Sequence, residues 1–163
     1  MATNNAINLA GPTPAFSAVL SSNHTGTNAY QVIFDTVLVD TTSSYNNGTG
    51  VYTIPTSGIY LLSSHITYGQ YSNNATTFIF IYMSINGIPY QFGLMPGIAS
   101  CPGYAGPNNW LAFDCNIILP LTSGNNIFVS VNGTGNTSND NVVGYSPATS
   151  YTTCFSGYMI AQV

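Results

Sequence analysis

Catalysis by side chains depends on ionisable groups that converge on a substrate, and this sequence contains few of them. Lys, Arg and Glu are absent, and the acids and histidines are Asp35, Asp40, Asp114, Asp140, His24 and His65. A serine hydrolase triad would combine Ser64 or Ser156 with a histidine and an aspartate, but neither serine lies in a nucleophile elbow. A pairing of Cys115 or Cys154 with His65 has no more support from its surroundings. We therefore predict that the protein is not an enzyme.

The aspartates are also the candidate ligands for a metal ion. Calcium binds carboxylate and carbonyl oxygens, and the weak candidates for this role are Asp40, Asp114 and Asp140. No local cluster of oxygen ligands surrounds any of the three, which favours solvated or turn-capping roles for them. We predict no cofactor and keep calcium as the alternative.

Three cysteines, Cys101, Cys115 and Cys154, form an odd set without the spacing of a zinc site. At most one internal pair can form. Cys115 falls on the apolar side of a strand-like stretch, which favours a buried free thiol. The sequence leaves a disulfide between Cys101 and Cys154 open.

The charge content excludes several functions. Charged residues make up 2% of the 163 residues and the net charge is −4, while hydrophobic residues reach 45%, so the chain is expected to fold. Nucleic-acid binding and polybasic attraction to anionic lipid both require Lys or Arg. No run approaches the roughly 18 apolar residues of a membrane span, and no signal peptide follows Met1. We expect no nucleic-acid partner and no membrane insertion, and an extracellular or particle-surface location.

The elements that would position these groups are strands. Segments rich in β-branched and aromatic residues, bounded by Gly, Pro, Asn and Ser, cover residues 30–40, 58–68, 76–86, 88–95, 109–121, 126–132 and 153–162. Residues 30–40 are apolar on both alternating faces, which is typical of a strand buried on both sides. Asn86-Gly87 predicts a two-residue hairpin, and Gly58 is expected to serve a turn with an unusual backbone. Helical spacing with start and stop signals is absent, so the pattern predicts an all-β fold of about ten strands, a sandwich, jelly roll or barrel.

One domain accounts for most of the chain. Residues 1–13, which end in Gly-Pro-Thr-Pro, are expected to be a tail or linker, and residues 14–163 to form the domain. The loop-like stretches 96–109 and 133–147 are the expected places for binding, because loops on a rigid β scaffold usually carry it. Trp110, beside the first of them, is expected to pack in the core rather than to contact a sugar.

The order of several motifs resembles the globular head of the complement C1q family, whose fold is TNF-like. The matching stretches are Ala15–Ala18, Val32–Asp35, Thr49–Tyr52, Pro55–Tyr60 and Phe155–Tyr158, and the motif positions are Phe16, Phe34, Asp40, Tyr45, Tyr52, Gly58, Tyr60, Phe155 and Gly157. The match runs from Ala15 to Ile160. Tyr52 stands where the family has Phe, Leu62 stands for a second Phe, and Ser64 replaces an aromatic residue. The resemblance implies a jelly-roll β-sandwich in which the motif positions form core and turns rather than a functional site.

The resemblance also implies a homotrimer, and the sequence of residues 76–86 supports one. This segment is apolar on both faces, so one face would stay exposed in a monomer, and large exposed apolar patches mark interfaces. We expect one of the two faces to line the trimer axis. The candidate interface residues are Phe78, Phe80 and Tyr82 on one face and Ile79 and Ile81 on the other.

Together these observations predict a non-enzymatic, trimeric head for structure and attachment on the surface of a particle such as a virion, phage fibre or bacterial spore. Its ligand would be a glycan or a protein receptor. The alternative is a soluble secreted recognition protein of the same fold, lectin-like or cytokine-like. The absence of basic residues argues against that alternative, because such proteins commonly capture ligands with charged patches.

Overall fold

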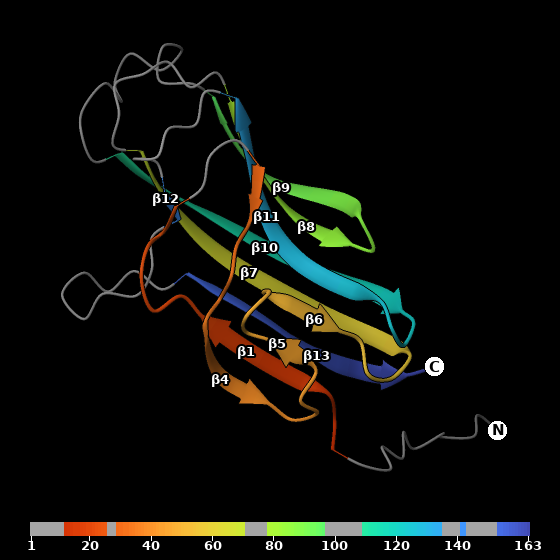
Figure 1. The fold of residues 1–163 in the computed structure, drawn as a ribbon. Helices are drawn as coiled ribbons and strands as arrows, with labels where there is room; N and C mark the ends of the chain where they lie inside the picture. Colours follow the sequence, from red (N-terminus) through yellow and green to blue (C-terminus); the bar gives the residue numbers. More distant parts are fainter. Residues whose placement is uncertain (1–11, 26–28, 71–77, 97–108, 135–140, 143–152) are drawn as a thin grey trace.

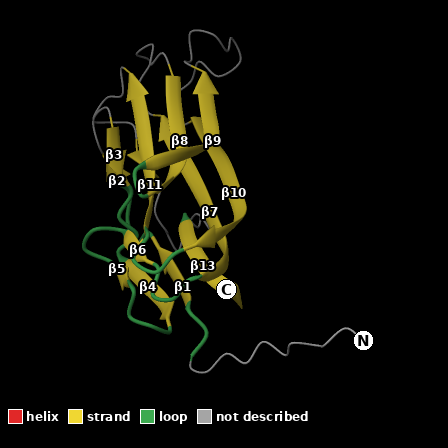
Figure 2. Ribbon diagram, turned by 90° about the vertical axis from the view of Figure 1, so that its right-hand side faces the viewer, coloured by secondary structure: helices red, strands yellow, loops and turns green. Residues whose placement is uncertain are grey.

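The computed structural model describes residues 12–25, 29–70, 78–96, 109–134, 141–142 and 153–163. These residues form strands and no helix, in two antiparallel sheets packed face to face (Figures 1 and 2). The predicted all-β jelly roll is therefore confirmed. The prediction that residues 1–13 form a tail or linker concerns residues of which the structure describes only 12 and 13.

Sheet A has seven strands. Six of them follow the order β2-β12-β7-β13-β1-β4, and the seventh, β10, pairs with β7. Its strands are β1 (Ala15–Val19), β2 (His24–Thr25), β4 (Thr36–Asp40), β7 (Gly58–Gln70), β10 (Asn109–Leu121), β12 (Asn141–Val142) and β13 (Cys154–Gln162). The pairing of β7 with β10 runs without a break from Gly58↔Leu121 to Gln70↔Asn109. Alternate residues of β7, from Tyr60 to Ile66, are buried against sheet B.

Sheet B has six strands. Five of them follow the order β5-β6-β11-β8-β9, and the sixth, β3, pairs with β11. Its strands are β3 (Ala29–Gln31), β5 (Tyr45–Asn46), β6 (Val51–Thr53), β8 (Phe78–Ile85), β9 (Ile88–Pro96) and β11 (Asn126–Thr134). The β8–β9 hairpin closes through Asn86 and Gly87, whose φ angles are 50° and 81°. Two consecutive positive φ angles define a type I′ turn, so the hairpin prediction is confirmed.

The prediction of one strand over residues 30–40 is wrong. The segment is divided between β3 in sheet B and β4 in sheet A, and residues 32–35 connect the two sheets. Val32 and Phe34 are fully buried in this crossing, whereas Val37, Leu38 and Val39 on β4 are exposed. The uniform apolar pattern therefore has two causes: a buried crossing, followed by a strand at the edge of sheet A.

Aromatic rings fill one end of the core. The Phe16 ring stacks on Tyr52, with the two centroids 3.9 Å apart, and meets the edge of Phe155 at 4.8 Å. Tyr45 stacks on the same Phe16 ring at 5.4 Å. Burial of such rings contributes much of the stability of a core of this size.

Glycine at two motif positions allows close approach of neighbouring groups. A Cβ on Gly157 would stand 2.8 Å from Phe16 Cε1, and one on Gly58 would stand 2.5 Å from the carbonyl oxygen of Ala161. Gly58 begins strand β7 and is not among the residues with positive φ. The expectation of an unusual backbone there is therefore wrong, and the position needs Gly because sheet A leaves no space for a side chain.

The two tyrosines of this core predict opposite effects of losing a hydroxyl. The Tyr45 hydroxyl donates to the carbonyl of Phe34 at 3.0 Å, whereas the buried Tyr52 hydroxyl makes no hydrogen bond of ordinary geometry in the described part of the chain and has only a weak interaction with the side chain of Thr42. We expect Tyr45→Phe to lower the free energy of unfolding by about 1 kcal/mol, and Tyr52→Phe to leave it unchanged or raise it. Urea unfolding of both variants measures the difference. Equal destabilisation by the two changes would contradict the hydrogen bonding described here.

Candidate functional site

Asp40 holds a tight turn between β4 and β5. One carboxylate oxygen accepts the backbone N–H groups of Thr42 and Ser44 at 3.3 and 3.1 Å, and the other accepts that of Tyr45 at 2.9 Å. Ser43, at the tip, has a positive φ of 52°. The carboxylate is occupied by the backbone, which accounts for an acidic residue at this motif position without a role in chemistry.

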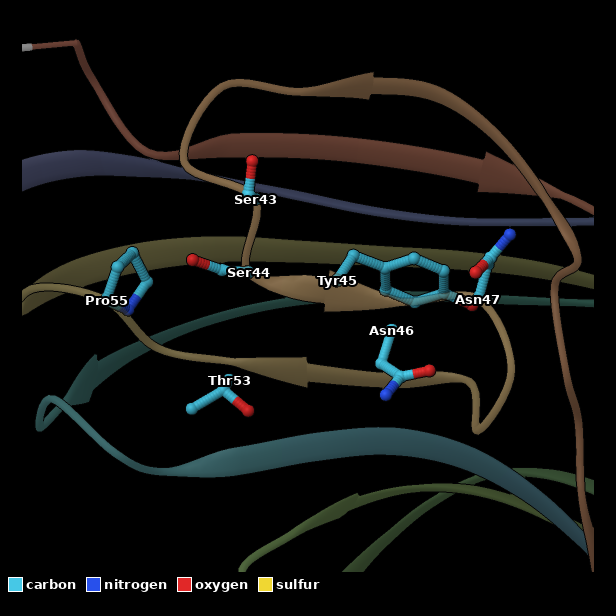
Figure 3. Close-up of a pocket in the computed structure, with 7 residues that line it drawn as sticks. All are labelled: Ser43, Ser44, Tyr45, Asn46, Asn47, Thr53 and Pro55. Carbon is cyan, nitrogen blue, oxygen red and sulfur yellow. The ribbon is translucent and has the colours of Figure 1, made fainter.

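A shallow polar hollow of about 630 Å³ opens beside this turn (Figure 3). Its lining residues carry no charge and are Ser43, Ser44, Tyr45, Asn46, Asn47, Thr53 and Pro55. Asn46 Oδ1 accepts the backbone N–H groups of Gly48 and Thr49 at 2.9 and 3.1 Å, which fixes the orientation of its side-chain amide. The Thr53 hydroxyl donates to Asn126 Oδ1 at 2.8 Å. The hollow therefore presents uncharged hydroxyl and amide groups at the edge of sheet B.

Three reactive residue types lie in one row on the outer face of sheet A, the side turned away from sheet B. Asp114, His65 and Cys154 are register partners across β10, β7 and β13, although they are far apart in the sequence. His65 Nδ1 is 2.7 Å from Asp114 Oδ1, and His65 Nε2 is 3.4 Å from the Thr67 hydroxyl. Burial raises the pKa of the Cys154 thiol, so the thiolate needed for nucleophilic attack is disfavoured.

A second histidine lines a smaller hollow of about 200 Å³, formed by Leu20, Ser22, Asn23, His24, Ile33 and Asp35. His24 Nδ1 accepts the backbone N–H of Ile33 at 3.2 Å, and burial lowers the pKa of this histidine. Burial acts to raise the pKa of Asp35, but hydrogen bonds from the backbone and side chain of Ser21 outweigh it and hold that pKa below its usual value. The neutral form of His24 is thus favoured, and this hollow carries one carboxylate.

The outer face of sheet A also carries an apolar row. Ile118 and Tyr158 both pair with Leu61, so the three side chains lie side by side across β10, β7 and β13. Ile118 is 60% exposed and Tyr158 is 49% exposed, and Ile160 beside them is 42% exposed. We call Ile118, Leu61 and Tyr158 the apolar row. Exposed apolar side chains that are contiguous in this way mark an interaction surface.

The outer face of sheet B is different, because it carries aromatic rings between polar side chains. Ile81 and Met83 of β8 are fully buried in the core, so Tyr82 and Phe80 point away from it. Phe128 of β11 likewise alternates with the buried Ile127 and Val129. These three rings are half-buried and lie on the solvent side of the sheet.

Comparison with known proteins identifies this architecture. A sequence model described as the C1q domain matches residues 15–86. The globular domain of zebrafish complement 1qA protein superposes with a TM-score of 0.64 at 14% identity, over 92% of this chain and 99% of that one. Murine APRIL superposes with a TM-score of 0.59 at 12% identity, over 91% of this chain and 100% of that one. The fold of this chain is that of the C1q-like and TNF-like jelly rolls. No curated protein sequence matches this chain.

The C1q-like motif positions lie in the interior. The six aromatic ones are all buried in the core cluster, and they are Phe16, Phe34, Tyr45, Tyr52, Tyr60 and Phe155. None of them lies free on the surface to act on a ligand. The motif residues therefore maintain the fold, and the surfaces of the C1q-like domain carry whatever binding it performs.

The candidate trimer residues on β8 separate into two groups in the C1q-like domain. Ile81 is fully buried between the sheets, so its face is already covered in a single subunit. Phe80 and Tyr82 remain on the outer face of sheet B, and the side chains of Phe78 and Ile79 lie outside the described part. Ile118 and Tyr158 of the apolar row on sheet A are more exposed than Phe80 and Tyr82, and the sequence pattern did not indicate this row.

Other candidates of the sequence analysis are placed only in part. Cys115 is a buried free thiol, which confirms that prediction. Asp140, Cys101, the side chain of Trp110 and most of the two predicted binding loops lie outside the described residues. Within the described residues, no group of three or more His, Cys, Asp or Glu side chains is arranged to hold a metal ion. The same part of the chain has no helix long and apolar enough to cross a membrane.

Proposed function

We propose that this C1q-like domain is a non-enzymatic, homotrimeric attachment head displayed on the surface of a particle such as a virion, phage fibre or spore. The observation that carries the proposal is the apolar row on the outer face of sheet A. Ile118, Tyr158 and the neighbouring Ile160 would each remain in water in a monomer. Burying them between subunits is favourable by roughly 25 cal/mol for each Å² of apolar surface.

The polar part of the same face is compatible with subunit contact. Beside the apolar row lie Asn116, Ser63 and Ser156, which are register partners across β10, β7 and β13. These short uncharged side chains can exchange hydrogen bonds with water for hydrogen bonds across an interface. Lys and Arg are absent from the chain, so no basic side chains face one another when copies pack together. A surface without basic charge also suits dense display on a particle.

A recognition role fits the arrangement better than catalysis does. The thiol of Cys154 has a raised pKa, and Asp40 is engaged by backbone N–H groups, so neither is prepared for a reaction. Asp114 is paired with His65. Because both described candidate calcium ligands already have protein partners, we propose that assembly does not depend on calcium.

The native mass tests the proposal. Light scattering on a sizing column should give a single species of about three times the chain mass of 17.2 kDa, with and without a calcium chelator. A stable monomer would contradict the trimer, and dissociation by the chelator would contradict calcium independence. Display on a particle is tested separately. An antibody against the domain should label the outside of intact particles that carry the protein. Detection of the protein only in the culture medium would favour a soluble recognition protein.

A further inference from the structure

We propose that the outer face of sheet B binds a neutral oligosaccharide, with Tyr82 and Phe128 as the platform and Asn126 as a directing amide. The proposal deepens the recognition function proposed above by naming a ligand class and its site. It does not depend on the trimer, because the apolar row lies on the other sheet.

The rings lie across small residues. Phe128 pairs with Ser84, and Tyr82 pairs with Ser130, in the register of β11 and β8. Both serines point to the solvent side of the sheet, yet Ser84 is only 3% exposed and Ser130 only 6%. Neighbouring side chains must therefore cover them, and the directly opposed rings are placed to do so. A ring that lies down over a serine keeps one flat face against the sheet and presents the other to solvent.

Amide and hydroxyl groups continue the face beyond the rings. Asn126 lies two residues before Phe128 on the same side of β11, and its Oδ1 accepts the Thr53 hydroxyl at 2.8 Å. That bond fixes the orientation of the Asn126 amide. The Nδ2 group of this amide is a donor that takes no part in the bond. Thr53 in turn borders the polar hollow, which Asn46 lines (Figure 3). The distance from Tyr82 on β8, across β11 and β6, to β5 is about three strand spacings, roughly 14 Å. A surface of this length suits an oligosaccharide rather than a single sugar.

The charges of the chain favour an uncharged ligand. Asp35 precedes strand β4, Asp40 ends it, and Asp114 lies on β10 of sheet A. Asp40 is beside the polar hollow, but its carboxylate already accepts the backbone N–H groups of Thr42, Ser44 and Tyr45 and supplies no basic charge there. With no Lys or Arg in the sequence, an anionic glycan would find no counter-charge. A neutral sugar needs none, since its hydroxyls can both donate to and accept from side-chain amides.

The backbone pairing disfavours a peptide as the occupant. Strand β11 is paired with β8 on one side and with β6 and β3 on the other, and β8 is paired with β11 and β9. A peptide therefore cannot extend the sheet at this place by main-chain hydrogen bonds. The ligand must be held by side chains alone. A pyranose ring has an apolar face of C–H groups that stacks on an aromatic ring, and equatorial hydroxyls that reach amides at its rim.

The experiment uses the purified chain and isothermal titration with three neutral hexasaccharides: cellohexaose, maltohexaose and chitohexaose. A heparin-derived hexasaccharide serves as the charged comparison. We expect at least one neutral probe to bind and the heparin probe not to bind. Tyr82→Ser should weaken that binding by about tenfold or more, and Tyr82→Phe should retain it, because stacking needs the ring rather than the hydroxyl.

Two further variants separate the site from the fold. Asn126→Asp keeps an oxygen to accept from Thr53 but removes the amide donor, and should also weaken binding by about tenfold. Tyr90→Ser is the matched control, because Tyr90 is 37% exposed on β9 but pairs with Met83, on the other side of the sheet. It should leave affinity unchanged.

Three results would overturn the inference: no binding of any neutral probe, binding of the heparin probe alone, or binding that Tyr82→Ser and Asn126→Asp leave intact. Light scattering on the same samples keeps the two proposals apart. A trimer that binds no neutral sugar would reject the ligand class and leave the trimeric head standing. A monomer that binds one would do the reverse.

Discussion

Gly157→Val is expected to prevent the domain from folding. Gly157 lies opposite Phe16 in the pairing of β13 with β1, on the core side of sheet A. A Cβ there would stand 2.7 Å from Leu62 Cδ2 and 2.8 Å from Phe16 Cε1. Phe16 cannot move aside, because its ring stacks on Tyr52 at a centroid distance of 3.9 Å. Overpacking by a single methylene costs about 1–3 kcal/mol, and three added carbons at this point are expected to cost more than about 4 kcal/mol, which approaches the whole stability of a domain at the lower end of the usual range of about 5–15 kcal/mol.

Urea unfolding followed by circular dichroism measures this effect. The matched control is Gln162→Val, which places the same side chain at an exposed position of β13 outside its pairing with β1, and should change the free energy of unfolding by less than about 1 kcal/mol. Phe16→Leu should restore part of the stability of Gly157→Ala, since the two positions share one space. A Gly157→Val protein with a normal unfolding midpoint would show that the packing around Phe16 differs from the one described.

Ile118→Asp combined with Tyr158→Asp is expected to convert the trimer into monomers. Both residues flank Leu61 on the outer face of sheet A, so the double change puts two carboxylates into the apolar row of every subunit. Burying an unpaired carboxylate costs several kcal/mol, and no Lys or Arg exists in the chain to compensate it. Since the row is exposed in a single subunit, the monomer itself should keep its fold.

The control for this variant is Ile88→Asp. Ile88 in the β8–β9 hairpin is 61% exposed, almost the same as the 60% of Ile118, but it belongs to sheet B. Light scattering should show one chain mass for the double variant and three for the control, with similar circular dichroism spectra. Dissociation of the control but not of the double variant would move the interface to sheet B, where Phe80 and Tyr82 lie.

The sequence determines much of the fold through local signals. The Asn86-Gly87 turn is specified by two residues that adopt positive φ easily, and the aromatic motif positions are apolar residues within strand-like segments. Other features depend on pairing between distant segments, which no local pattern encodes. His65, Asp114 and Cys154 form a row because β7 lies between β10 and β13.

When a segment has apolar residues on both faces, the alternation of apolar and polar side chains cannot predict which face is buried. The pattern of residues 30–40 predicts one doubly buried strand, although Val37, Leu38 and Val39 are at an exposed edge. The same ambiguity on β8 hides which face is the core, and only the packing of sheet B against sheet A shows that it is the face of Ile81. The sequence pattern does not indicate the apolar row, because its members come from three different strands and form a patch only after folding.

The position of β1 between β4 and β13 has a consequence for how the protein is made (Figure 1). Ala15 pairs with Tyr158 and Val19 with Cys154. Strand β1 therefore cannot form the backbone hydrogen bonds along its second edge until β13 is present. During synthesis, strand β13 must have left the ribosome before sheet A can close around β1. Folding should therefore follow translation and be slow, as expected for a topology dominated by contacts distant in sequence. Until then the apolar strands remain open to mispairing, and nascent chains should depend on holding chaperones.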